Sequence, residues 1–211
     1  MNISKKKILV IVAHSDDESF GCGGFIKNMS KKNLIRVVSF TNGVSSRDKS
    51  QNKQILKRKS SSTAAAKILG FKWIKQFDYP DNQMDGVNLL SIVKNIEQIK
   101  KIFNPHIVIT HNFSDLNVDH RKVAEATLTA FRPEPKQKLE MFLTFEVPSS
   151  TDFRTIRSKR IFVPNFFVNI ESSLKDKIKA IKVYKGEFKK KPHSRSIDGI
   201  KNLSKIRGNQ C

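Results

Sequence analysis

Residues 10–24, VIVAHSDDESFGCGG, decide how the chain folds. They begin inside an aliphatic run, residues 8–13, of the kind that forms a strand buried on both faces of a parallel sheet. A histidine and three consecutive acidic residues follow almost at once, although neighbouring like charges repel one another. The sequence therefore predicts that a positive partner lies among these side chains.

The rest of the chain alternates aliphatic runs with helical patterns, which favours an α/β fold. We expect a doubly wound, mostly parallel, Rossmann-like sheet with helices on both faces. The expected strands cover residues 8–13, 34–40, 71–77 and 106–110, with two more over 139–147 and 160–170. The expected helices cover residues 23–32, 51–69, 89–103, 118–131 and 173–188, followed by a short final helix.

The length and the charge of the chain limit what it can be. Its 211 residues suffice for one sizeable core, so we expect a single domain over residues 1–211. The 40 Lys and Arg against 19 Asp and Glu give a net charge of +21, which favours an anionic partner such as a phosphorylated substrate, a membrane surface or a nucleic acid. Because the charge comes without a nucleic-acid-binding motif, a solvated basic surface is the simpler explanation, and we expect no specific nucleic-acid binding.

Cysteine usage and hydropathy favour a cytoplasmic location. Cys22 and Cys211 lie far apart and form no CxxC motif, which predicts neither a disulfide framework nor a thiolate metal site. The basic N-terminus leads into an apolar run that ends in acids, unlike a signal peptide, and no stretch reaches transmembrane length. We therefore predict a cytoplasmic protein, peripheral at the membrane if its substrate is lipid-linked.

Two polar clusters follow strands of the predicted sheet. His14 and Asp17 come directly after the first strand, and His120 ends the stretch THNFSDLNVDH, residues 110–120, after another. Ligands of open α/β sheets bind at the carboxyl ends of the strands, beside the point where the strand order reverses. We therefore expect the two clusters to meet at one edge of the sheet.

The two imidazoles and one carboxylate of His14, Asp17 and His120 suit Zn²⁺, or another divalent transition metal in its place. Three protein ligands leave a position for water, as in catalytic zinc sites, and the metal supplies the missing positive charge. Asp16 then remains as the natural general base. Asp119 adjoins His120 on a predicted helix and faces another way, so we expect it to orient another group.

Each motif alone has a simpler explanation. A His-x-Asp-Asp sequence could cap a helix among surface acids, and an Asp-His pair could open any helix. Their joint placement at the ends of neighbouring strands favours the metal site.

The residues also resemble a known family. AHSDDE, residues 13–18, is similar to the AHPDDE signature of the PIG-L/LmbE-like zinc-dependent N-acetylglucosamine deacetylases, with Ser15 in place of proline. The resemblance spans nearly the whole chain and includes RKSSSTAAAKILG (58–70), YPDNQMDG (79–86), DLNVDHR (115–121) and PHSRSIDGIKNLSKIRGNQ (192–210). It implies that His14, Asp17 and His120 bind zinc and that Asp16 is the base.

The resemblance further implies that Arg58 and Asp81 contact the substrate, although a helix-surface arginine is the alternative for Arg58. Ser61 replaces a glutamate that is usual in the family. Relatives commonly continue past the position of Cys211, which leaves open that a C-terminal extension is lacking.

Asn117 is the main departure, because many relatives carry a histidine at this position, three residues before the metal-binding one. Asparagine cannot act as a general acid. Either Asn117 helps to hold the oxyanion of the substrate while another group delivers the proton, or catalysis is weakened. His193 is the first candidate for that acid and His111 the second, since a histidine at a strand end is equally expected to be structural.

These observations predict zinc-dependent hydrolysis of the N-acetyl group of an amino sugar. The sugar is expected to be nucleotide-, lipid- or glycoside-linked, to be anionic, and to belong to surface-polysaccharide or sugar biosynthesis. One alternative is the deacetylation of a malate-linked glucosamine thiol precursor. Another is an inactive metal-retaining or nucleic-acid-associated binding module, which the spare carboxylate beside an open metal position disfavours. A homo-oligomer stays open, because the final strands could pair with a neighbouring chain.

Overall fold

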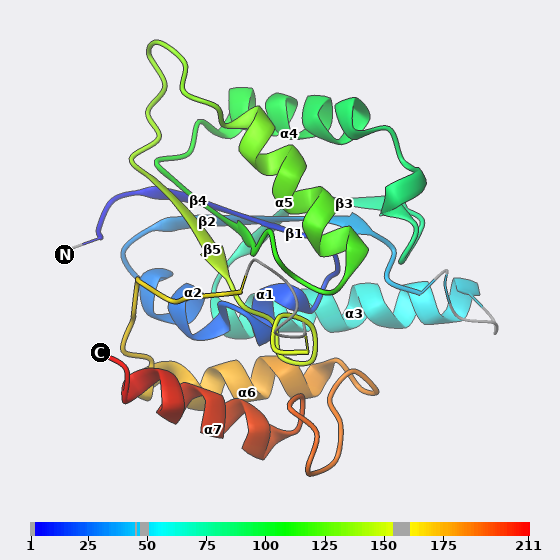
Figure 1. The fold of residues 1–211 in the computed structure, drawn as a ribbon, viewed down its shortest axis with the longest axis vertical. Coiled ribbons are helices and arrows are strands. Elements are labelled where there is room, and N and C mark those ends of the chain that lie inside the picture. Colours follow the sequence, from blue (N-terminus) through cyan, green and yellow to red (C-terminus); the bar gives the residue numbers. More distant parts are fainter. Residues whose placement is uncertain (1–2, 45, 47–50, 154–160) are drawn as a thin grey trace.

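A parallel β-sheet forms the centre of the molecule (Figure 1). The computed structural model describes residues 3–44, 46, 51–153 and 161–211. Within these residues, five parallel strands pair in the order β3-β2-β1-β4-β5. They are β1 (Lys7–Val12), β2 (Leu34–Thr41), β3 (Lys72–Tyr79), β4 (Ile107–His111) and β5 (Met141–Phe145). The predicted Rossmann-like architecture is confirmed.

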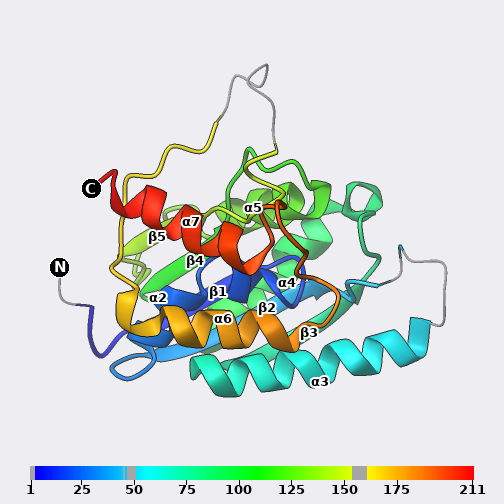
Figure 2. The same cartoon turned by 90° about the horizontal axis from the view of Figure 1, so that it is seen from below.

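Helices cover both faces of the sheet (Figures 1 and 2). Helices α4 (Leu89–Phe103) and α5 (Val118–Ala130) pack on one face. The other face carries α1 (Asp17–Phe20), α2 (Gly23–Met29), α3 (Gln51–Leu69), α6 (Leu174–Val183) and α7 (Ile197–Gly208). Single turns of 3₁₀-helix lie at Met84–Gly86 and Glu171–Ser173. None of the helices in the described part of the chain is long and apolar enough to cross a membrane.

Strand β1 contributes to two separate cores. Ile8 and Val10 pack with α2, α3 and α6, whereas Leu9 and Ile11 pack with α4 and α5, and all four side chains are fully buried. Each such side chain stabilises the fold by about 1.5–3 kcal/mol relative to an exposed position. The uninterrupted aliphatic run of β1 thus reflects a strand that is covered on both faces.

The helix ends follow local sequence signals. Gly70 directly follows α3 with a φ of +83°, a conformation that favours glycine, and a Cβ atom there would lie 2.7 Å from Ser30 Oγ. Asn88 caps α4 by accepting a hydrogen bond from Leu90 N, and Asn104 ends that helix with a left-handed backbone. These signals explain why the predicted bounds of α3 and α4 agree with the structure.

The prediction was wrong in the last third of the chain. Residue 160 lies outside the described residues, and residues 161–170 form no strand. Pro164 lacks the backbone N–H that strand pairing needs, and no residue of this segment is buried. Near the N-terminus the short helix α1 was not predicted, and in the last third the helix expected over residues 173–188 ends at Val183. In this region apolar composition alone was not enough to predict strand pairing.

The two cysteines differ sharply in exposure. Cys22 lies at the start of α2 and is buried, and burial raises the pKa of its thiol, whereas Cys211 is exposed. We predict that a thiol reagent modifies Cys211 in the folded protein and Cys22 only after unfolding, because the thiolate is the reactive form. Mass spectrometry of protein labelled with and without denaturant checks this. Rapid labelling of Cys22 in a folded Cys211→Ser variant would contradict the packing described for α2.

Candidate metal centre

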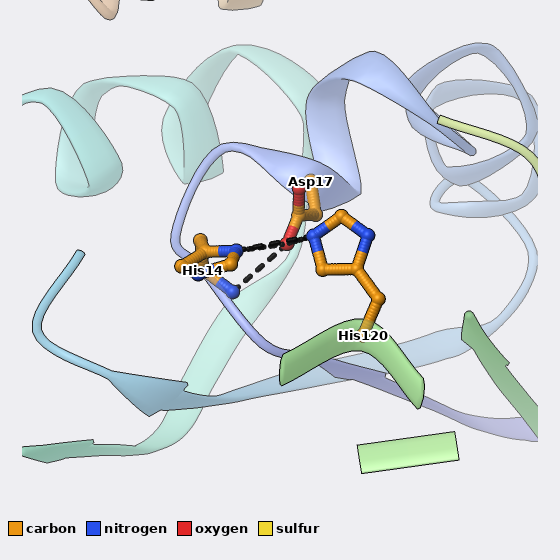
Figure 3. A group of neighbouring side chains, drawn as sticks. All are labelled: His14, Asp17 and His120. Atoms are coloured by element: carbon orange, nitrogen blue, oxygen red, sulfur yellow. Dashed lines mark hydrogen bonds and ion pairs between the residues drawn. The ribbon is translucent and has the colours of Figure 1, made fainter. Parts of the chain in front are cut away.

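The candidate site lies where the strand order of the sheet reverses. The chain leaves β1 toward α1 on one face and leaves the adjacent β4 toward α5 on the other. His14 and Asp17 follow β1, and His120 lies in the first turn of α5 (Figure 3). All three side chains are buried. The two clusters that the sequence placed at the strand ends therefore do meet.

Three atoms of these residues converge on one point (Figure 3). His14 Nδ1 lies 3.1 Å from Asp17 Oδ2 and 3.1 Å from His120 Nε2, and His120 Nε2 lies 3.3 Å from Asp17 Oδ2. In a tetrahedral zinc site with bonds of about 2.0–2.1 Å, two ligand atoms are about 3.3 Å apart. The spacing of the three atoms therefore fits one face of such a tetrahedron.

The far nitrogens of both imidazoles face carboxylates. His14 Nε2 lies 3.1 Å from Asp119 Oδ2 and 3.1 Å from Asp81 Oδ1, while His120 Nδ1 lies 3.1 Å from Asp115 Oδ2. Each carboxylate favours a proton on the nitrogen that it faces, which leaves the lone pair of the other nitrogen for the centre. Two lone pairs and a carboxylate oxygen then face one another, an arrangement that requires a cation.

The three supporting carboxylates are themselves held in place. Asp119 accepts hydrogen bonds from Asn82 N (2.7 Å) and Met84 N (3.1 Å), and Ser46 Oγ donates to Asp81 Oδ2. The orienting role expected for Asp119 thus has a geometric counterpart in its contact with His14. Asp81 touches the same imidazole nitrogen, so a metal at the centre would also depend on the 79–86 turn.

Asp115 is a residue that the sequence argument missed. It accepts hydrogen bonds from Ser150 Oγ (2.5 Å), Thr151 Oγ1 (2.8 Å) and Asn117 N (2.8 Å) while it faces His120. Its only sequence signal was an acid five residues before His120 in a loop at a strand end. The partners Ser150 and Thr151 lie more than thirty residues away in the sequence, so no local sequence pattern predicts these contacts.

The electrostatics of the cluster favour positive charge at its centre. Burial would lower the pKa of His120, but Asp17 and Asp115 raise it to about 9. Burial would likewise raise the pKa of Asp81, but the contact with His14 lowers it to about 2. The pKa values of Asp17 and Asp115 are lowered as well, so these three carboxylates stay ionised near neutral pH, and either protons or a metal ion must balance them.

Asp16 lies beside the convergent atoms and lines a cavity of about 220 Å³. Arg58 Nη2 donates to Asp16 Oδ1 at 2.8 Å, while Asp16 Oδ2 is 3.9 Å from Arg195 Nη2, beyond hydrogen-bonding distance. Burial raises the pKa of Asp16, and Arg58 counteracts this shift. The carboxylate is thus fixed through one oxygen and turns the other toward the cavity side that Arg195 lines.

Arg58 is buried and is not the helix-surface arginine of the simpler explanation. Its Nη1 donates to Glu187 Oε1 at 3.0 Å and its Nε to Ser15 Oγ at 3.2 Å, in addition to its bond with Asp16. Ser15, which replaces the proline of the family signature, therefore helps to orient this guanidinium. Ser61 Oγ, another departure, donates to Val183 O at 2.8 Å and links α3 to α6.

Asn117 caps α5 and lines the cavity. Its Oδ1 accepts hydrogen bonds from Asp119 N (2.8 Å) and His120 N (3.3 Å), and its Nδ2 donates to Asn82 Oδ1 (3.0 Å). The side chain that the sequence assigned to the substrate thus also fixes the helix start that carries two site residues.

The two histidines considered as general acids lie elsewhere. His193 is not among the described residues that line the cavity; its ring packs against Phe153, and its Nδ1 accepts a hydrogen bond from Arg195 N at 3.0 Å. His111 is fully buried, accepts a hydrogen bond from Ala13 N at 2.8 Å and stacks on His120, with ring centroids 3.9 Å apart. Burial lowers the pKa of His111 to about 3, so the structure favours the structural alternative for this residue.

Comparison with known proteins identifies the family. The profile of PIG-L, described as GlcNAc-PI de-N-acetylase, matches residues 9–131, which include both polar clusters. The chain belongs to this family. The uncharacterized deacetylase YaiS of Escherichia coli K12 is 31% identical over 153 residues, which are 69% of this chain and 76% of that protein. Diacetylchitobiose deacetylase of Thermococcus kodakarensis is 23% identical over 193 residues, 87% of this chain and 70% of that protein.

Solved structures share the fold at lower identity. N,N'-diacetylchitobiose deacetylase from Pyrococcus horikoshii matches with a TM-score of 0.78 and 20% identity, covering 97% of this chain and 79% of that one. GalB, the 4-carboxy-2-hydroxymuconate hydratase from Pseudomonas putida, matches with a TM-score of 0.74 and 21% identity, covering 97% and 87%. The PIG-L-type fold thus supports more than one reaction, and the chemistry has to be argued from the site.

Removing the carboxylate behind one imidazole should weaken metal binding. We predict that Asp115→Asn lowers the affinity for Zn²⁺ by roughly 10–100-fold, because the amide no longer favours a proton on His120 Nδ1. Competition with a chromophoric chelator measures this. Asp78→Asn, a change at an exposed carboxylate, is the control and should bind zinc as the unaltered protein does. Equal affinities of all three proteins would mean that His120 is not held for a metal.

Proposed function

We propose that this protein hydrolyses the N-acetyl group of an amino sugar and releases acetate and a free amine. His14, Asp17 and His120 would hold Zn²⁺ or another divalent transition metal. The observation that carries the proposal is the convergence of His14 Nδ1, Asp17 Oδ2 and His120 Nε2 beside the carboxylate of Asp16. Membership of the de-N-acetylase family supports the same reaction.

A metal held there would polarise the amide carbonyl and lower the pKa of water. The chain's own part in proton transfer falls to Asp16. The other acids among the described residues that line the cavity, Asp81 and Glu187, contact His14 and Arg58. Asp16 therefore takes a proton from the attacking water and returns it to the nitrogen of the leaving amine, which needs no separate histidine acid.

Substrate contacts are proposed for Arg58, Asp81 and Asn117, which all line the cavity. Arg58 also positions Asp16 through its 2.8 Å bond, so its substitution would act on the base as well as on binding. Asp81 belongs to the 79–86 turn and Asn117 caps α5, whereas Arg58 lies on α3. They supply polar groups for the hydroxyls of a sugar ring.

The size and charge of the site bear on the substrate class. A cavity of about 220 Å³ is small beside the roughly 300–1,000 Å³ of sites that enclose whole ligands, so we propose that one N-acetylated sugar ring enters and its linked group stays outside. Exposed Lys189–191 follow Glu187 in the chain, and the net charge is +21. This charge favours an anionic linked group, such as a nucleotide, a lipid pyrophosphate or malate, in sugar or surface-polysaccharide biosynthesis.

Replacement of the proposed base gives the direct test. We predict that zinc-loaded wild-type protein releases amine and acetate from at least one of N-acetylglucosamine, UDP-N-acetylglucosamine, malate-linked N-acetylglucosamine and diacetylchitobiose. Asp16→Asn should lower kcat by roughly 10²–10⁴-fold because it cannot accept the proton. Amine labelling and an acetate assay measure both products.

The control for this test is Asp78→Asn, which should keep wild-type kcat, and the zinc content of all proteins is measured alongside. An Asp16→Asn variant that is as active as the wild type would remove Asp16 from the mechanism. A zinc-loaded wild type that leaves all four compounds intact would favour a non-catalytic binding module instead.

A further inference from the structure

Two arginines are among the described residues that line the cavity, and only one of them directs all three guanidinium nitrogens to protein oxygens within hydrogen-bonding distance. Arg58 directs Nε, Nη1 and Nη2 to Ser15, Glu187 and Asp16 at 2.8–3.2 Å. Arg195 donates from Nε to Pro148 O at 3.3 Å. Its Nη2 lies 3.9 Å from Asp16 Oδ2 and 4.0 Å from Asp17 Oδ1, so both carboxylates are beyond hydrogen-bonding distance.

The guanidinium of Arg195 is nevertheless held in one place. It lies over the ring of Phe20, 4.3 Å from its centroid, and the side chain is only 17% exposed. The backbone of Arg195 is fixed as well, since its N–H donates to His193 Nδ1 and its carbonyl oxygen accepts from Lys189 N at 3.2 Å. A donor fixed before the substrate arrives loses little entropy when it binds.

Arg195 lies close to the place where the substrate is expected to react. Its Nη2 lies about equally far from the proposed base and from a proposed metal ligand, so an atom bound between these two acids is within its reach. The acids themselves would repel an oxygen that gains negative charge there. A cation with free N–H groups is what such an oxygen needs.

We propose that Arg195 donates a hydrogen bond to the acetyl carbonyl oxygen and stabilises the oxyanion that forms from it, an inference that rests on the proposed deacetylation. The water oxygen bonds to the carbonyl carbon, Asp16 takes one water proton, and the π electrons of the carbonyl move to its oxygen beside Arg195. When that electron pair re-forms the C=O bond, the C–N bond breaks and the nitrogen takes the proton from Asp16. Acetic acid and the amine leave, and the acid then loses its proton to solvent.

The nitrogens of the other candidates for this role already donate to protein oxygens. Asn117 uses Oδ1 to cap α5 and directs Nδ2 to Asn82, and Arg58 directs its donors to three protein oxygens. The sequence suggested His193 as the general acid. In the structure its Nδ1 instead accepts a hydrogen bond from the backbone N–H of Arg195 and so helps to position that residue.

Arg195→Gln and Arg195→Lys test the proposal, with Arg132→Gln at a side chain that is 56% exposed as the control. The probes are the neutral N-acetylglucosamine and the anionic UDP-N-acetylglucosamine, and kcat, KM, zinc content and Tm are measured for each protein. We expect Arg195→Gln to lower kcat by roughly 10²–10³-fold on whichever probe is turned over, with little change in KM, zinc content or Tm. Arg195→Lys should recover part of this loss because it keeps the charge.

Product binding gives a readout that does not need turnover. Acetate places an oxygen where the oxyanion forms, so its dissociation constant, measured by calorimetry, should rise roughly tenfold in Arg195→Gln and stay unchanged in Arg132→Gln. Unchanged acetate binding in a folded Arg195→Gln variant would overturn the proposal.

Several results of the kinetic, zinc and Tm measurements would also overturn it. Wild-type kcat in Arg195→Gln would remove Arg195 from the reaction. An increase in KM confined to the UDP-linked probe would mean that Arg195 binds the anionic part of the substrate. A fall in Tm or zinc content that accounts for the lost activity of both variants would make its role structural. A wild type that turns over neither these probes nor malate-linked N-acetylglucosamine or diacetylchitobiose is a different failure, because it overturns the deacetylase itself and this inference with it.

Discussion

Four buried carboxylates around two imidazoles are the constraint on which the rest of the structure depends. Asp17, Asp81, Asp115 and Asp119 would destabilise the fold if they faced one another alone. Asp81, Asp115 and Asp119 instead face histidine nitrogens, and Asp17 Oδ2 converges with the two remaining histidine nitrogens at 3.1–3.3 Å. The end of β1, the start of α5, the 79–86 turn and the loop after β5 all contribute to this one cluster, so a cation bound at its centre would also stabilise the fold.

The C-terminal part of the chain completes the site that the two N-terminal motifs begin. Glu187, Arg58, Asp16 and Arg195 form a row of alternating charges along one wall of the cavity, with the first and last contributed by the segment between α6 and α7. Ser15 supports this row through Arg58 Nε. Ser15, where the family signature has proline, therefore accepts a hydrogen bond that a proline side chain could not accept.

The sequence predicted much of this, and its failures have physical reasons. The buried run of β1 and the capped helices α3 and α4 carry local signals, and the motifs at two strand ends suffice to bring His14, Asp17 and His120 together. The pairing of Asp115 with Ser150 depends on long-range folding. Which side chain of the segment around residues 193–195 enters the cavity depends on a turn geometry that composition does not encode, so Arg195 lies there where His193 was expected.

X-ray absorption spectroscopy of the zinc-loaded protein tests the central claim, a metal held by two imidazoles and one carboxylate, most directly. The account predicts two imidazole nitrogens and light oxygen or nitrogen neighbours at about 2.0–2.2 Å, with no sulfur, and the loss of one imidazole in His120→Ala. A sulfur ligand, or a spectrum that His120→Ala leaves unchanged, would contradict it and place the metal elsewhere.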